Sequence, residues 1–393
     1  MSEDRSGERD AERGTAERDA ERGTAEPEVE PGITAPEDVM PPEREVTAEQ
    51  LSLGRRLRQP KTIISLVVPL ILVALMVRVA LDVKLSDLVD GISRANPLLL
   101  LAAFGIYYLG FPLRGLRWVL ILRGTGFRIR VWDATEIIFL SWLVNCLVPA
   151  KLGDIYRAYL LKINSPVSLS RTFGTVFIER ILDLFAISIL GLAAGFVSFR
   201  TGLPPAIQVV FGLGVAVIIL LGAGLLTMRN FGRRILLVLP VPHRIIEYYD
   251  RFEEGVFGAI GLRHLPPLVF VTGLIWTTEA LRLYFVVQAL GFVDVHLGIS
   301  GAFFVALIAS LLTAVPLTPA GLGVVEAGVL GVLTVAYGVG RIQATTIALV
   351  DRAISVLSII LLGSIAYALS SKRRGVGIEA IETRPHPETN PTG

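Results

Sequence analysis

The chain has 393 residues, of which 52% are hydrophobic and only 18% are charged. A water-soluble domain of this size would not carry so many long apolar runs, so the composition indicates a polytopic membrane protein. The single cysteine, Cys146, lies in an apolar run and the four histidines lie outside such runs, which argues against disulfides within the chain, cysteine-based metal sites and an intramembrane histidine relay.

The first part of the chain is strongly acidic. Residues 1–50 hold 16 Asp and Glu but only six Arg, although the whole chain has a formal net charge of +2. The nine residues ERDAERGTA occur at 8–16 and again at 17–25. This composition cannot bury enough apolar surface to fold, so we expect residues 1–55 to form a disordered acidic tail.

Six apolar runs are long enough to cross the ~30 Å hydrocarbon layer of a membrane. They lie near 61–81, 97–122, 172–199, 206–228, 267–290 and 343–369. Two further apolar regions, 133–163 and 299–338, are interrupted near the middle by Pro and Gly. We expect an all-α integral membrane domain over 61–370, followed by a cytoplasmic tail, 371–393.

Lys and Arg orient the runs, because cytoplasmic loops are enriched in both. Such residues flank the first run, follow the second, fill the loop 229–265 and follow the last run. Six full crossings satisfy all four positions only if each interrupted region enters and leaves on the same side, as a re-entrant broken hairpin. We therefore predict about eight hydrophobic segments: six spans, a cytoplasmic hairpin at 133–163 and an outer hairpin at 299–338. We expect both termini in the cytoplasm and the chain in the plasma membrane.

An internal repeat links the two interrupted regions. The turns Pro149–Gly153 and Pro319–Gly323 share the pattern P-A-x-L-G. Each turn follows a span that contains an Arg, and precedes a span with an acid-Arg dipeptide and a Gly twelve residues after the acid. These residues are Arg117, Glu179 and Gly191 in the first unit, and Arg282, Asp351 and Gly363 in the second. The two units, about 97–199 and 267–369, would begin on opposite sides of the membrane, as in transporters whose substrate site lies where inverted repeats meet.

Several charged residues lie inside the apolar runs, where each costs at least ~2.5–3.5 kcal/mol and is a functional candidate. Glu179 and Arg180 are adjacent and point about 100° apart on a helix, so we expect Glu179 to pair with an arginine on another span. Glu279 and Arg282 are three residues apart and share one helix face. The alternative, that these charges only hold helices together, stays open.

Further charges follow the two breaks, where half-helices would turn their positive dipole ends into the protein and attract an anionic group. Lys151 and Arg157 could instead simply obey the preference of basic residues for the cytoplasmic side. No catalytic residue, metal ligand or cofactor is predicted. The residues predicted to bind lipid or substrate are Arg117, Lys151, Asp154, Arg157, Glu179, Arg180, Asp183, Glu279, Arg282, Pro319, Gly321, Gly323, Glu326, Asp351 and Arg352.

The stretches LVPAKLGDIYRAYLL, TVFIERILDLFAI, VPLTPAGLGVVEAGVL and DRAISVLSIILLG resemble the flippase-like transmembrane region of lysylphosphatidylglycerol synthases. The resemblance covers about 61–370. It implies a membrane domain that moves aminoacylated phosphatidylglycerol to the outer leaflet in the multiple peptide resistance factors, where a soluble aminoacyltransferase domain is attached. Other members are fused to glycosyltransferases or stand alone. Here only 24 residues follow position 369, so we expect a stand-alone member without that domain.

The leading hypothesis is therefore a flippase or transporter for an anionic or head-group-modified lipid, amino-acylated or glycosylated, held between the two broken hairpins. A membrane-embedded enzyme with Glu326 or Glu179 as base, and an accessory subunit, are the alternatives. Enzyme activity is the less favoured reading, because no clear catalytic motif is present. The expected partners are a membrane lipid and a separate lipid-modifying synthase or glycosyltransferase, with no nucleic acid.

Overall fold

A computed structural model of the chain describes residues 85–148, 151–199, 205–238, 242–258, 265–314 and 318–374. All of these belong to one unit, Leu51–Gly393. The predicted acidic tail 1–55, the first predicted span 61–81 and most of the C-terminal tail, 375–393, lie outside the described residues.

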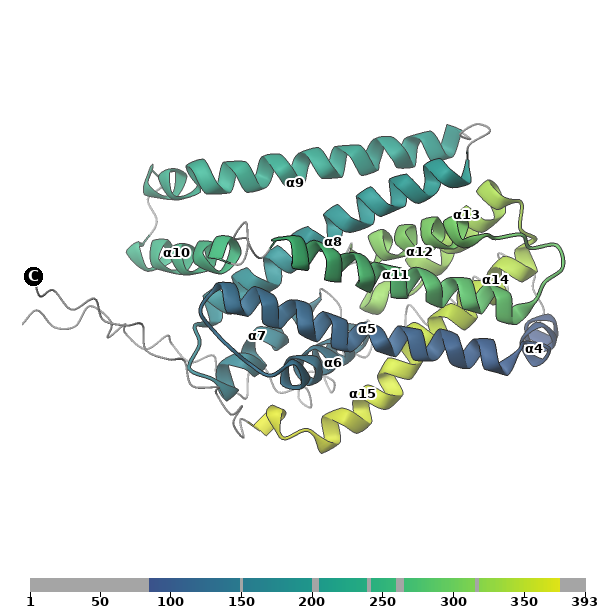
Figure 1. Ribbon diagram of the computed structural model, residues 1–393, viewed down its shortest axis with the longest axis horizontal. Helices are drawn as coiled ribbons and strands as arrows, with labels where there is room; N and C mark the ends of the chain where they lie inside the picture. The colour runs from purple at the N-terminus through teal and green to yellow at the C-terminus, as the bar shows by residue number, and fades with distance from the viewer. Residues whose placement is uncertain are drawn as a thin grey trace, which may run out of the picture. The chain divides into compact units, whose positions relative to one another are not determined.

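Every regular element in the described ranges is helical, which confirms the all-α prediction there (Figure 1). The α-helices are α4 (Leu85–Ser93), α5 (Pro97–Gly124), α6 (Val131–Leu147), α7 (Leu152–Asn164), α8 (Leu169–Ser198), α9 (Pro205–Val238), α10 (His243–Gly258), α11 (Leu265–Leu290), α12 (Ile299–Ala314), α13 (Val324–Tyr337), α14 (Arg341–Arg352) and α15 (Ser358–Leu369). Three short helical turns accompany them: η2 (Pro319–Gly321), η3 (Ala353–Leu357) and η4 (Lys372–Arg374). The turn η3 is a π-helical bulge that joins α14 to α15.

Five segments of the described residues are long and apolar enough to cross a membrane. They are Pro97–Gly124, Leu169–Ser198, Leu265–Leu290, Pro319–Tyr337 and Arg341–Leu369. Four of them coincide with predicted spans, and Pro319–Tyr337 is the second half of the predicted outer hairpin. The predicted span 206–228 falls in α9, whose apolar stretch Gly212–Met228 is shorter. Multiple membrane-spanning helices in one chain make it a multi-pass membrane protein.

Helices α5 and α11 lie side by side and run in opposite directions. The chain enters α5 through Asn96, whose side chain caps the helix by accepting from the backbone N–H of Leu98 at 2.9 Å, with Pro97 in the first turn. The backbone N–H of Asn96 in turn donates to Ala289 O near the end of α11 at 2.7 Å. The start of α5 therefore meets the end of α11, and nearer the middle of the two helices Arg114 binds Glu279.

Both interrupted regions break where Pro and Gly predicted a break. Helix α6 ends at Leu147 and α7 begins at Leu152, while α12 ends at Ala314 and α13 begins at Val324 after the turn η2. Among the described residues, the non-glycine residues with left-handed backbone are Lys151 (φ 51°) and Ala320 (φ 52°), one in each turn. L-residues rarely adopt this conformation, and it is found at functional sites more often than elsewhere.

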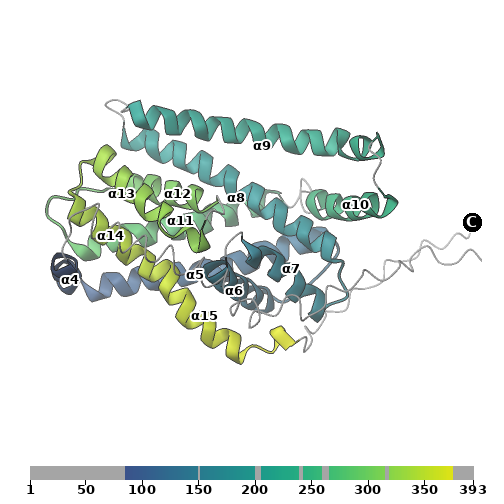
Figure 2. The ribbon, with the colours of Figure 1, turned by 180° about the vertical axis from the view of Figure 1, so that it is seen from behind.

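The helices on either side of the first break pack unusually closely. A Cβ atom added at Gly153, at the start of α7, would lie 2.0 Å from Ser141 O of α6. Only glycine allows this approach. On the other face of α6, seen from behind in Figure 2, α15 packs where Leu143 meets Gly363.

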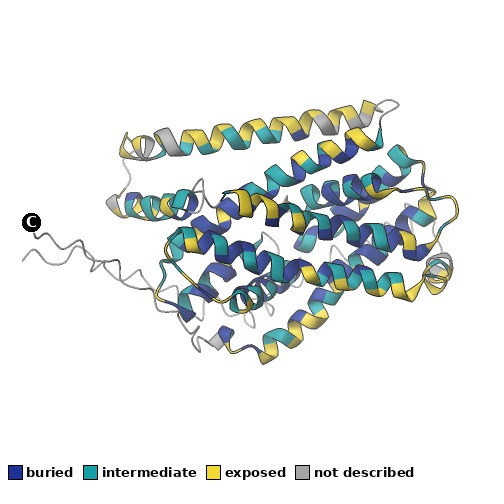
Figure 3. Ribbon diagram, viewed as in Figure 1, coloured by how far each residue is buried: buried dark blue, intermediate teal, exposed yellow. Residues whose placement is uncertain are grey.

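Apolar side chains are also exposed in large numbers at the outer surface. Along α9, Val209, Ile219, Leu220 and Leu226 are each more than 60% exposed, and Figure 3 shows exposed residues over much of this helix. An exposed apolar surface of this kind would be unfavourable in water and is the surface expected against lipid.

Candidate functional site

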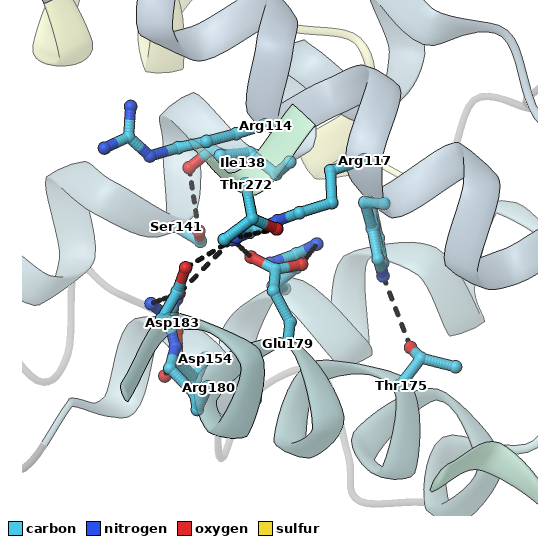
Figure 4. Close-up of polar contacts among 12 residues, drawn as sticks. Arg114, Arg117, Ile138, Ser141, Asp154, Thr175, Glu179, Arg180, Asp183 and Thr272 are labelled. Atoms are coloured by element: carbon cyan, nitrogen blue, oxygen red, sulfur yellow. Dashed lines mark hydrogen bonds and ion pairs between the residues drawn. The ribbon is translucent and has the colours of Figure 1, made fainter. Parts of the chain in front are cut away.

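Glu179 on α8 is the centre of a first charge cluster. Its carboxylate accepts two hydrogen bonds from Arg157 of α7, at 3.0 and 2.7 Å, and one from Arg117 of α5 at 3.0 Å. Arg117 also donates to Asp183 at 2.5 Å (Figure 4). Arg117, Arg157 and Glu179 are 1–2% exposed. The prediction that Glu179 pairs with arginines of other helices, not with its neighbour Arg180, is confirmed.

Arg180 points away from Glu179 and joins α8 to the first break. Its guanidinium donates to both carboxylate oxygens of Asp154 at 3.0 and 2.9 Å, and to Asp183 at 3.2 Å. Asp183 also accepts from the Trp276 indole N–H of α11 at 3.2 Å. Since the Arg180 side chain is 30% exposed, this pair is the most accessible part of the cluster.

The buried arginines are also covered by aromatic rings. The Arg157 guanidinium lies 3.9 Å from the centre of the Trp118 ring, which is fully buried. Arg114 lies 4.7 Å from the Trp142 ring centre. Such cation–π contacts, stronger where water is excluded, hold each guanidinium plane in one orientation.

A second charge cluster lies between α5, α11 and α14. Glu279 accepts from Arg114 of α5 at 2.5 Å and from Arg282 one turn along α11. Arg282 also donates to both oxygens of Asp351, at 2.7 and 3.1 Å. The predicted shared face of Glu279 and Arg282 is thus confirmed. Asp351, the other partner of Arg282, belongs to the acid-Arg dipeptide of the second unit.

Arg352, the other half of that dipeptide, holds the second break. It donates to Glu326 at 2.8 Å and to the backbone carbonyl of Ala320. Glu326 also accepts the backbone N–H of Gly323 at 2.6 Å, which caps α13. The strained backbone of the turn is therefore held through the Arg352–Glu326 ion pair, since Arg352 binds the carbonyl of Ala320 and Glu326 binds the N–H of Gly323.

The two units make the same two kinds of ion pair. In each, an Arg of the first helix binds the acid of the acid-Arg dipeptide, and the Arg of the dipeptide binds a carboxylate 26 residues earlier, just after the break. The pairs are Arg117–Glu179 and Arg180–Asp154 in the first unit, and Arg282–Asp351 and Arg352–Glu326 in the second.

The turns correspond as well. Lys151 and Gly321 occupy the third position of the shared pattern and both have left-handed backbone, at φ 51° and 72°. In the fifth position, each glycine donates its backbone N–H to a side chain: Gly153 to the amide oxygen of Asn145 at 2.8 Å, and Gly323 to the carboxylate of Glu326. The second break thus carries a charged cap where the first carries a neutral one.

A cavity of about 150 Å³ lies between the two breaks. Nine of the fifteen predicted residues line it: Lys151, Asp154, Arg180, Asp183, Glu279, Arg282, Gly321, Asp351 and Arg352. The other six do not: Arg117, Arg157, Glu179, Pro319, Gly323 and Glu326. The structure thus places part of the predicted set behind the cavity wall, where it supports the residues that face the space.

Sequence reasoning missed several lining residues. Arg114 lies three residues before Arg117 in the same apolar run, so the rule that singled out Arg117 would have found it. Trp142 and Asn145 carried no comparable signal, because tryptophans and polar residues near helix ends are common. Trp276 lies near the middle of its span but is uncharged, so the cost that singled out the charged residues does not apply to it.

Positive charge exceeds negative charge around the cavity. Five cations line it, Lys151 and four arginines, against four carboxylates. Each of these arginines binds at least one carboxylate, whereas Lys151 forms no ion pair with any other residue that the structure describes. Burial lowers the pKa of Lys151 to about 8, with a further contribution from the nearby Arg180, so its ammonium is mainly charged at neutral pH.

The carboxylates are poorly suited to act as bases, because the four that line the cavity are all held by arginines. Within the ranges that the structure describes, no three His, Cys, Asp or Glu side chains form a group that could hold a metal ion. The arrangement is suited to binding a polar group between two helix breaks.

Comparison with known proteins identifies one matching family. The family described as the lysylphosphatidylglycerol synthase TM region matches residues 62–363. A UPF0104 membrane protein of Methanocaldococcus jannaschii is 37% identical over 224 residues, which is 57% of this chain and 92% of that protein. A UPF0104 membrane protein of Methanothermobacter thermautotrophicus is 29% identical over 298 residues, 71% of this chain and 86% of that protein.

A further relative is larger. Glycosyltransferase AglD of Haloferax volcanii is 28% identical over 318 residues, which cover 70% of this chain but only 49% of that protein. The chain therefore resembles both short membrane proteins and part of a longer protein with an enzymatic name.

Proposed function

The chain belongs to the family of the lysylphosphatidylglycerol synthase transmembrane region, and from this premise we propose that it carries a lipid with an anionic or modified head group across the membrane. The head group enters the cavity between the two breaks, and the acyl chains stay in the bilayer. The cavity is smaller than the roughly 300–1,000 Å³ of pockets that enclose a whole small-molecule ligand, and fits a head group alone.

The observation that carries this proposal is the placement of the cavity. Its wall takes Lys151 and Arg180 from the first unit and Gly321 and Arg352 from the second, so a bound group would contact both breaks. Ionisable residues inside a membrane protein are functional-site candidates by default, because they are costly to place there. A scaffold would need neither the cavity nor the strained turns beside it.

We also propose that the two units form an inverted repeat and that the two broken regions are re-entrant hairpins. The antiparallel course of α5 and α11, the first helices of the units, supports this, and so do the matching ion pairs of the units. Movement of one unit against the other would then open the cavity to each side in turn. Six full crossings, cytoplasmic termini and a location in the plasma membrane complete this topology.

The relative AglD supports an alternative role in lipid-linked glycan metabolism. In that role the chain would be an enzyme or an accessory subunit acting on a glycosylated lipid. Under either reading, its partner would be a membrane lipid supplied by a separate lipid-modifying synthase or glycosyltransferase.

Reconstitution separates these roles. Purified protein in vesicles is expected to speed the movement of a fluorescent phosphatidylglycerol between leaflets, measured by quenching of the outer leaflet, while mass spectrometry of the recovered lipids finds no new species. A new lipid species would favour the enzyme, and neither movement nor new species would favour the accessory subunit.

A further inference from the structure

The cavity is electrically asymmetric, and the asymmetry lies at the first break. At the aligned third position the first turn has Lys151 and the second has Gly321, and both residues line the cavity. At the aligned fifth position the first turn is capped by the neutral amide of Asn145, whereas the second is capped by the carboxylate of Glu326.

The helix dipoles reinforce this difference. Helices α7 and α13 both begin beside the cavity, so both turn a positive end toward it. At α13, Glu326 binds a free N–H of the first turn and compensates the dipole. At α7, Asp154 lies in the first turn but is engaged by both donors of Arg180. The surplus positive charge of the cavity is therefore concentrated around Lys151.

The other cations that line the cavity are less free than Lys151 to bind an incoming anion. Each of the four lining arginines is already bound to a carboxylate, so an incoming anion would have to displace one. Three of these carboxylates line the cavity, and the partner of Arg352 is Glu326 behind the wall. Lys151 alone offers an ammonium without a carboxylate partner among the described residues, and a compact ammonium beside a helix N-terminus is a familiar setting for phosphate.

We propose that Lys151 is the residue that selects the head group, by binding the phosphate of a net-anionic lipid. This proposal rests on the lipid-carrier function proposed above and makes its substrate class specific. Arg180 binds Asp154, three residues after Lys151, and its side chain is 30% exposed. It becomes a second donor when the anion displaces part of its contact with Asp154. A head group with a surplus positive charge, such as an amino-acylated one, would instead meet Lys151 as a like charge.

Lipid binding to the purified full-length protein tests this. Native mass spectrometry would compare phosphatidylglycerol, a monoanion, with phosphatidylcholine and with lysyl-phosphatidylglycerol as probes. We expect the wild-type protein to retain phosphatidylglycerol at least about tenfold better than lysyl-phosphatidylglycerol. Lys151→Gln should remove this preference, because the charge-assisted hydrogen bond to the phosphate is lost. Lys151→Arg should keep it. Lys162→Gln is the matched control, because Lys162 lies near the other end of α7 and does not line the cavity.

The outcomes separate the inference from the proposed function. The role of Lys151 would be overturned if the wild-type protein preferred the cationic lipid, a result that does not depend on the folding of any variant. It would also be overturned if Lys151→Gln bound the lipids as the wild type does. If soluble glycerophosphate binds as tightly as the lipid and loses affinity in Lys151→Gln, the phosphate contact stands, but the lipid-carrier function fails.

The pH dependence gives a second readout. Burial lowers the pKa of Lys151 most, and the nearby Arg180 lowers it further. The carboxylates of Asp154 and Asp183 raise it. The Lys151 ammonium is charged at a pH below its pKa of about 8, and the charge is lost as the pH rises through that value. Retention of phosphatidylglycerol should therefore fall between about pH 7 and pH 9 in the wild type but not in Lys151→Arg, and equal curves for the two proteins would contradict the assignment.

Discussion

Glu179→Gln is expected to destabilise the protein more than any other single change in the charge clusters. Glu179 is 2% exposed and is the common partner of Arg117 and Arg157, which are each 1% exposed. Glutamine keeps the size of the side chain but removes its charge, which leaves Arg157 without a carboxylate partner among the residues that the structure describes. Breaking a buried pair in this way costs about 3–5 kcal/mol, so we expect a lower thermal unfolding midpoint in detergent and a smaller folded fraction on size exclusion.

The chain provides a matched control for this change. Glu254 pairs with Arg171 at 2.5 Å, but these side chains are 51% and 31% exposed. An exposed pair contributes about 0–1 kcal/mol, so Glu254→Gln should unfold nearly as the wild type does. If Glu179→Gln and Glu254→Gln lower the midpoint equally, the first cluster is not the structural support described here.

Glu326→Gln is expected to reduce lipid movement about ten- to a hundredfold. It should cost less stability than the change at Glu179, because Arg352 keeps its bond to Ala320 O. Glutamine can still accept the backbone N–H of Gly323, so α13 keeps its cap, but the charged bond to Arg352 is lost. Losing a charge-assisted hydrogen bond of about 1.5–3 kcal/mol corresponds to this range of rates. Arg352 also donates to Ala320 O, so the second break would lose one of the two contacts through which Arg352 holds it in its strained form.

The measurement is the initial rate of transfer of fluorescent phosphatidylglycerol in reconstituted vesicles, at equal amounts of folded protein. Glu254→Gln again serves as the control for a lost carboxylate. Transfer at the wild-type rate by Glu326→Gln would show that the second break does not take part in movement, and would restrict the lipid path to the first unit.

Much of the fold could be predicted because membranes impose simple rules. Apolar length identified the spans that became α5, α8 and α11, and Pro with Gly located both breaks. The cross-pairing of Glu179 followed from helix geometry, since adjacent residues point apart. These are local properties that one stretch of sequence contains by itself.

Partner choice was not predictable in the same way. Arg114 and Glu279 are 165 residues apart, and only the antiparallel packing of α5 on α11 brings them together. Likewise, nothing in the sequence distinguishes Arg157, buried behind the cavity under Trp118, from Arg180, which faces it. As a result, removing Arg157 should mainly reduce stability, whereas changes at Arg180 should affect binding.

The most direct test of the central claim, that the cavity opens to each side of the membrane in turn, uses Cys146. It is the single cysteine of the chain, it lines the cavity, and it is only 4% exposed. A small, anionic, membrane-impermeant thiosulfonate would be added to sealed vesicles of either orientation. If the cavity opens to each side in turn, Cys146 should react slowly from both sides, and phosphatidylglycerol should slow the reaction from each. Reaction from one side alone, whatever lipid is present, would contradict alternating access.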